Sequence, residues 1–168
     1  MGSARGAAFV AVSAALAIGC NDPRALSDAD GRLRRFSDTL AASQAAHSLR
    51  RLFCLKLHDH PERSEDCATL SGLISGMEER IAAHPEAGPR CPEGKGKPDE
   101  EKRCNCEWAW VQIGAAKVAL TSWTDVVATN KFVAFPKTPP RSFAAEMEQS
   151  GSDQANKFWT LGCKPPSR

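Results

Sequence analysis

The stretch CNCEWAWVQIGAAKVALTSWTDVVATN, residues 104–130, decides the fold, because it can be interpreted as one helix or as two strands. As strands, CEWAWVQI and KVALTSW would flank Gly114-Ala115 in a hairpin. As a helix, the stretch places Trp110, Ile113 and Val127 on one face. Its alanine content favours the helix, which Asn130 would end in the left-handed conformation.

Upstream of this stretch, the sequence predicts a first long helix. Residues 27–57 are dominated by Ala, Leu, Arg and Gln, which favour helix, and Ser27 or Asp28 can serve as its N-cap. The segment HDHPE, residues 58–62, interrupts the helical pattern at its proline. We therefore expect the chain to turn at this point.

The remaining segments alternate between predicted helix and predicted loop. A second helix is expected over residues 64–84, and a loop over residues 85–103, which hold prolines and glycines followed by a run of charges. Prolines make residues 131–141 extended, and residues 142–149 form a short helix. Residues 156–163 are interpreted as a helix end or an edge strand.

Together these segments predict a mainly α fold, a small disulfide-stapled helical domain over residues 20–168, preceded by a hydrophobic segment at residues 1–19. The alternative is an α+β fold, with an N-terminal helical hairpin and a C-terminal β-hairpin. The chain has 22 basic and 20 acidic residues among 168, a net charge of +2. This balance gives no electrostatic reason to expect a nucleic-acid partner.

The N-terminal run GAAFVAVSAALAIGC, residues 6–20, has the layout of a secretory signal, with Arg5 before it and small residues at its end. At ~1.5 Å per residue it spans about 22 Å, which is shorter than a ~30 Å hydrocarbon core. One cleavage site is Ala15-Leu16-Ala17, which would release a chain beginning at Ile18. A retained short helix that packs against a membrane-complex partner is the alternative to cleavage.

Residues 16–20, LAIGC, resemble the lipobox of bacterial lipoproteins. The resemblance covers the signal region alone, and it implies that the thiol of Cys20 accepts a diacylglyceryl group. A lipid on Cys20 would anchor the chain to a membrane, because each buried methylene contributes about 0.8 kcal/mol.

Six cysteines remain when Cys20 is lipidated, and an even number in an exported chain predicts disulfides. They are Cys54, Cys67, Cys91, Cys104, Cys106 and Cys163. A helical hairpin suggests a nested pairing, Cys67 with Cys91 and Cys54 with Cys104 or Cys106. We interpret the equal spacings from Cys54 to Cys67 and from Cys91 to Cys104 as coincidental, because on a helix they would place the second cysteine about 220° away from the first.

Two side-chain groups are candidates for chemistry or binding. His58 and His60, with Cys104 and Cys106, have the ligand types of a zinc or copper site. Both pairs have a single intervening residue, which is too close for a structural zinc site, so we expect an exposed His-Asp-His turn, no metal and no cofactor. Cys104 and Cys106 are expected to anchor two separate bridges.

The tryptophans gather in the last third of the chain, where they supply either core or a partner-binding surface. As partner-binding residues we name Trp108, Trp110, Trp123 and Trp159. PKTPP, residues 136–140, adds a stiff extended segment that another protein could recognise.

These observations predict a non-enzymatic exported protein of the periplasm or cell surface. It would be anchored by lipid and would bind another protein as an inhibitor, immunity factor or assembly factor. The alternative is an accessory subunit of a membrane protein complex in an oxidising compartment, with residues 6–20 retained as a short hydrophobic helix. A third hypothesis is a small enzyme or metal carrier that uses His58, His60 and nearby thiols.

Overall fold

The computed structural model describes residues 31–165, which form four α-helices and no strand. The helices are α1 (Gly31–Phe53), α2 (Ser64–Ala83), α3 (Pro98–Thr129) and α4 (Arg141–Thr160). Short 3₁₀ turns, η1 (Leu57–Asp59), η2 (Pro61–Arg63) and η3 (Pro85–Ala87), lie in the connections. The mainly α prediction is confirmed, and the alternative of a C-terminal β-hairpin is wrong.

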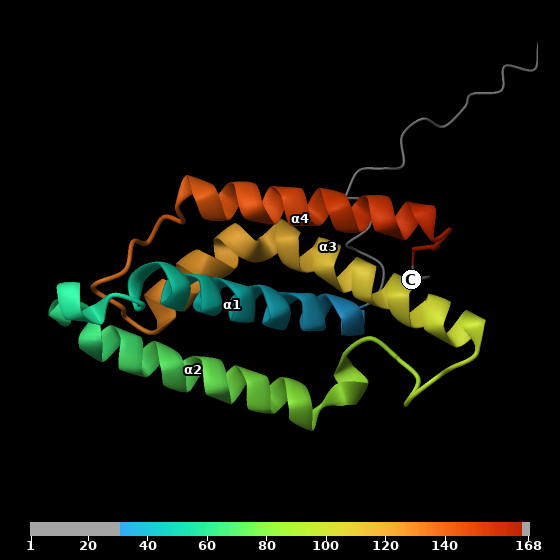
Figure 1. The fold of residues 1–168 in the computed structure, drawn as a ribbon, viewed down its shortest axis with the longest axis horizontal. Helices are drawn as coiled ribbons and strands as arrows, with labels where there is room; N and C mark the ends of the chain where they lie inside the picture. The colour runs from blue at the N-terminus through green and yellow to red at the C-terminus, as the bar shows by residue number, and fades with distance from the viewer. Residues whose placement is uncertain (1–30, 166–168) are drawn as a thin grey trace, which may run out of the picture.

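The helices lie side by side in the order α2, α1, α3, α4 (Figure 1). Helices α1 and α2 form one antiparallel hairpin and α3 and α4 form another, so that α1 and α3 run parallel (Figure 1). The core has two parts, one shared by all four helices near the C-terminal half of α3, the other among α1, α3 and α4 near its N-terminal half. No helix within residues 31–165 is long and apolar enough to cross a membrane.

Helix α3 lies between α1 and α4, which explains its composition. Burial on two sides requires apolar residues on more than one stripe. Its fully buried positions therefore run almost around the helix, and they include Ala109, Trp110, Val111, Ile113, Ala115, Ala119 and Trp123. A half-buried strand would need alternation of apolar and polar residues, which this stretch lacks.

Small residues let α3 approach its two neighbours closely. A Cβ atom built on Gly114 would lie 2.6 Å from Ser37 Oγ of α1, so a larger side chain would force the helices apart. On the other side, a Cβ on Gly151 of α4 would lie 3.1 Å from the Cβ of Ala116. Gly151 lies within α4, which runs from Arg141 to Thr160 and is therefore much longer than the predicted residues 142–149.

Two boundaries in the first three helices differ from the sequence prediction. Helix α1 ends at Phe53 rather than at residue 57, and the proposed caps Ser27 and Asp28 lie outside the described residues. Helix α3 begins at Pro98, so the predicted loop of residues 85–103 is too long. Proline favours the first helical position, and Glu100 Oε2 accepts a hydrogen bond from the backbone amide of Lys97 at 3.0 Å.

The end of α3 also differs from the prediction. Asn130 has a φ of −88°, so it does not adopt the left-handed conformation. Lys131 adopts it instead, with a φ of 55°. The Asn130 side chain donates a hydrogen bond to the carbonyl of Val126 at 2.8 Å, which satisfies one of the last carbonyls of the helix.

Six cysteines form three disulfides within residues 31–165: Cys54–Cys67, Cys91–Cys104 and Cys106–Cys163. The prediction that these six pair is confirmed, and Cys104 and Cys106 anchor separate bridges as expected. The nested pairing is wrong, and the equal spacings are not coincidental. Each such interval reverses direction at a turn instead of forming one helix, so its two ends meet.

Candidate functional site

The four predicted partner-binding tryptophans do not form one surface. Trp110 and Trp123 are 1% and 0% exposed, so a partner could not contact them without disrupting the core. Trp123 Nε1 donates a hydrogen bond to the carbonyl of Pro136 at 2.9 Å, which satisfies its polar atom inside the domain. Trp108 is 37% exposed and Trp159 is half-buried, and these two alone remain accessible.

The His58-Asp59-His60 segment lies on the exposed turn between α1 and α2, where the sequence predicts it. His58 Nε2 lies 2.9 Å from Asp59 Oδ1, and His60 Nδ1 lies 3.2 Å from Glu62 Oε1. Cys104 and Cys106 lie near the opposite end of the bundle and are both oxidised, so the two-histidine, two-cysteine set does not assemble. Within residues 31–165 no three His, Cys, Asp or Glu side chains converge as a metal site.

Three exposed apolar residues lie at one end of the bundle, where sequence analysis did not predict a site. Leu52, Leu55 and Val133 are 41%, 72% and 91% exposed. All three belong to the end of the bundle at which the α1–α2 turn meets the α3–α4 connection (Figure 1). We call these three residues together the apolar end.

Hydrogen bonds and buried side chains fix the α3–α4 connection, which carries Val133. One carboxylate oxygen of Asp66, at the start of α2, accepts hydrogen bonds from the backbone amides of Val133 and Ala134 at 2.9 and 2.8 Å. Phe132 and Phe135, on either side, are each 4% exposed and anchor the connection in the core. Val133 projects outward because its neighbours occupy the core, so its exposure is built into the connection.

The disulfide Cys54–Cys67 closes the turn that carries Leu55. Beneath the turn, the guanidinium of Arg63 lies 5.6 Å from the ring centre of Phe53, within the range of a cation–π contact. The half-buried Phe53 also packs against Phe135, with ring centres 5.8 Å apart. These contacts hold the α1–α2 turn against the α3–α4 connection.

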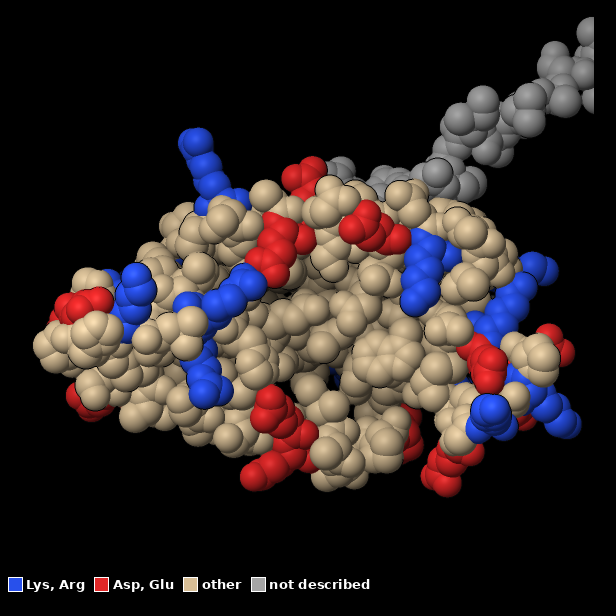
Figure 2. All heavy atoms as spheres, in the orientation of Figure 1, with Lys and Arg blue, Asp and Glu red and all other residues tan. Residues whose placement is uncertain are grey.

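The α1–α2 turn also carries charged residues, including Lys56, Asp59 and Glu62. Basic and acidic side chains lie together on this part of the surface (Figure 2). A hydrogen bond from its own backbone amide and interactions with His60 lower the pKa of Glu62, so this carboxylate is ionised at neutral pH. An apolar centre within a polar rim is the usual anatomy of a protein–protein interface.

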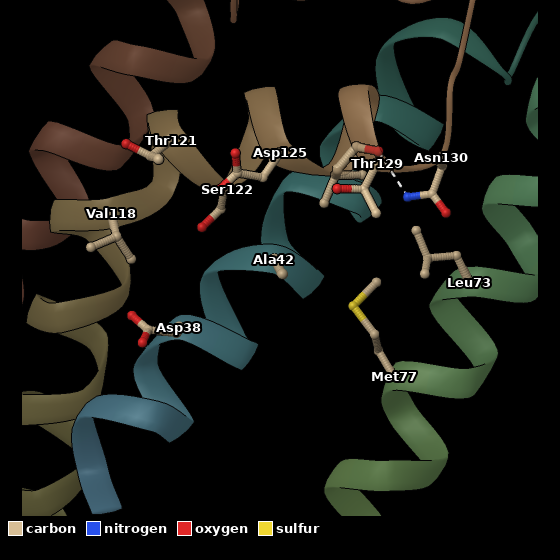
Figure 3. Close-up of a pocket in the computed structure, with 11 residues that line it drawn as sticks. Asp38, Ala42, Leu73, Met77, Val118, Thr121, Ser122, Asp125, Thr129 and Asn130 are labelled. Carbon is tan, nitrogen blue, oxygen red and sulfur yellow. Dashed lines mark hydrogen bonds between the residues drawn. The ribbon is translucent and has the colours of Figure 1, made fainter. Parts of the chain in front are cut away.

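A groove with a mixed polar and apolar lining lies among α1, α2 and α3, with a volume of about 540 Å³ (Figure 3). Asp38 of α1 and Asp125 of α3 line it, and Leu73 and Met77 of α2 form an apolar wall (Figure 3). Neither carboxylate makes a hydrogen bond or ion pair within residues 31–165. The lining also includes the hydroxyl groups of Thr121, Ser122 and Thr129.

Sequence reasoning missed both the apolar end and this groove, since each is assembled from segments that are far apart in the chain. The one signal available was KFVAFP, residues 131–136, in which Val133 alternates out of phase with two phenylalanines. No protein-family model, no curated protein and no solved structure matches this chain.

Proposed function

We propose that this chain is a lipid-anchored, exported protein that binds another protein through its apolar end. In this proposal it acts without catalysis, as an inhibitor, immunity factor or assembly factor in the periplasm or at the cell surface. The proposal rests mainly on one observation: Leu52, Leu55 and Val133 are all exposed at the same end of the bundle, where a hydrogen bond to Asp66 holds the chain at Val133. Exposed apolar residues that cluster at one place are typical of protein-binding sites.

The disulfides support export. Every cysteine after Cys20 is paired in the structure, and disulfides persist in oxidising compartments outside the cytoplasm. The signal-like run at residues 6–20 lies outside the described residues, so its cleavage and the lipid on Cys20 stay predictions.

The direction of α1 would make an anchor at Cys20 useful. Helix α1 has 23 residues and therefore a length of about 35 Å, with Gly31 at one end of the bundle and the apolar end at the other. A tether that joins α1 at its start would leave the apolar end on the far side of the domain from the attachment point. The partner would then be met away from the anchored end.

Site-specific photo-crosslinking in cells of the source organism tests this proposal. A photoreactive residue at position 55 or 133 should give an adduct with the same partner. Position 120 is the matched control, because Leu120 is 43% exposed on α3 but lies outside the apolar end. Adducts of equal yield at position 120, or none at positions 55 and 133, would refute binding through the apolar end.

The intact mass of the mature protein tests the anchor separately. Loss of residues 1–19 with a lipid on Cys20 would support the lipoprotein. A full-length mass with a stoichiometric partner would favour an accessory subunit that retains residues 6–20.

A further inference from the structure

We infer that a second groove, between the first half of α1 and the second half of α2, binds a small amphiphilic carboxylate with a single apolar chain. The groove has a volume of about 420 Å³, within the range of small-molecule sites. The groove lies along the first half of α1, whereas Leu52 and Leu55 lie at and just after the end of this helix. This inference therefore does not depend on the apolar end.

The floor of this groove is apolar and fixed in position. Phe36 and Met77 are 8% and 5% exposed, and Ile81 is half-buried beside them. The edge of Trp108 packs against the ring of Phe36, with centroids 6.0 Å apart. The backbone of Gly88 also lies against this ring, because a Cβ atom there would be 3.0 Å from it. These contacts fix the Phe36 ring in position, as a preformed apolar site requires.

The rim of the groove is cationic. Arg35 of α1 and Arg80 of α2 both line it, and no Asp or Glu does. Within residues 31–165 Arg35 forms no ion pair, and the hydrogen bond of Arg80 Nε, at 3.1 Å, goes to the carbonyl of Gly76 in its own helix. Arg35 and Arg80 thus line one groove from neighbouring helices, and its lining contains no carboxylate.

Two of the carboxylates near this groove are engaged with other groups. Glu107 lies 3.3 Å from Arg32 and also accepts a hydrogen bond from the backbone amide of Arg90 at 2.7 Å. Glu86 lies 3.1 Å from the imidazole of His84. Asp38, three residues after Arg35 on α1, lines the groove of Figure 3, and no carboxylate lines this one, so an anion bound here would meet Arg35 and Arg80.

The combination of floor and rim defines the class of ligand. A guanidinium binds a carboxylate through two parallel hydrogen bonds, and the apolar floor would cover the chain attached to that carboxylate. Decanoate is a simple probe with these two parts. Decyltrimethylammonium has the same chain with the opposite charge, so it separates recognition of the head group from burial of the chain.

Methyl NMR of the methionines tests the inference with an internal control. Met77 lines this groove and also the groove of Figure 3, whereas Met147 lines a third groove between α1 and α4, so the arginine variants below decide which groove the Met77 signal reports. The full chain carrying Cys20→Ser, labelled at the methionine methyls, would be titrated with decanoate below its micelle concentration. We expect a saturable shift of the Met77 signal, no shift of Met147, and at least tenfold weaker binding of decyltrimethylammonium.

Two variants connect the shift to the guanidinium groups. The double variant R35E/R80E should weaken decanoate binding at least tenfold. R34E, which changes the charge of the exposed neighbour on the same helix, should leave it unchanged. Equal shifts of both methionines, no shift of Met77, or equal affinity for the two probes would overturn the inference. None of these outcomes bears on crosslinking at positions 55 and 133.

Discussion

Removing the disulfide Cys106–Cys163 should destabilise the domain more than removing Cys91–Cys104. The first bridge joins residues 57 apart and ties the start of α3 to the end of α4, whereas the second joins residues 13 apart. In the chain-entropy account, stabilisation grows with loop length as about 1.5RT ln n. The two bridges are then worth about 4 and about 3 kcal/mol, a difference of about 1.3 kcal/mol.

Burial adds to this difference with the same sign. Cys163 is 5% exposed and packs in the core part near the N-terminal half of α3, whereas Cys91 is exposed. The alanine pair at 106 and 163 therefore loses packing as well as a cross-link, while the pair at 91 and 104 loses mainly the cross-link. We expect a difference of at least about 1.3 kcal/mol in the free energy of unfolding.

Urea unfolding of the oxidised proteins, followed by circular dichroism, measures this difference. The comparison uses two double variants, C106A/C163A and C91A/C104A, each with its other two disulfides intact. Equal m-values would show that both unfold to comparably open states. If C91A/C104A is destabilised as much as C106A/C163A, loop length does not govern the contribution of these bridges, and the reasoning fails.

Two further predictions concern packing and the apolar end. Gly114→Val should lower the free energy of unfolding in urea by about 1–3 kcal/mol, because the new side chain overpacks the contact with Ser37. Gly72→Ala places its new Cβ with nothing within 4 Å, so it should stabilise α2 by up to about 1 kcal/mol. Equal effects of the two variants would contradict this packing argument. Asp66→Ala removes the acceptor of two backbone amides, so it should lower the free energy of unfolding by about 1–3 kcal/mol and speed hydrogen exchange at the Val133 amide. Unchanged exchange at Val133 would show that the carboxylate does not hold the α3–α4 connection in place.

The choice of helix for residues 104–130 was predictable from composition, but the fate of its tryptophans was not. Trp110 and Trp123 are thirteen residues apart in sequence, so in α3 they point in directions about 220° apart. A helix covered on one side would expose one of them. Both are buried because α3 has α1 on one side and α4 on the other, and a single stretch of sequence does not reveal how many neighbours a helix will have.

The start of α3 illustrates how local signals can be misjudged. Residues 98–103 were assigned to a loop because of their charges, yet Pro98 suits the first helical turn and acidic residues follow it at once. Carboxylates stabilise the positive end of the helix dipole, so this run favours a helix start. The cationic groove has no such local signal, because Arg35 and Arg80 meet only when α1 and α2 pair.

The pairing of the cysteines and the proposed compartment depend on the same six sulfur atoms. The paired Cα atoms lie 5.8, 4.7 and 5.6 Å apart, within the range that a disulfide spans without backbone movement. In a reducing cytoplasm, thiols at these distances would stay reduced, and the bundle would lose these cross-links. Titration of free thiols in protein freshly isolated from its source therefore decides between the two compartments. Six reactive thiols would remove the support for export, whereas their absence would support an oxidising compartment for the cross-linked domain.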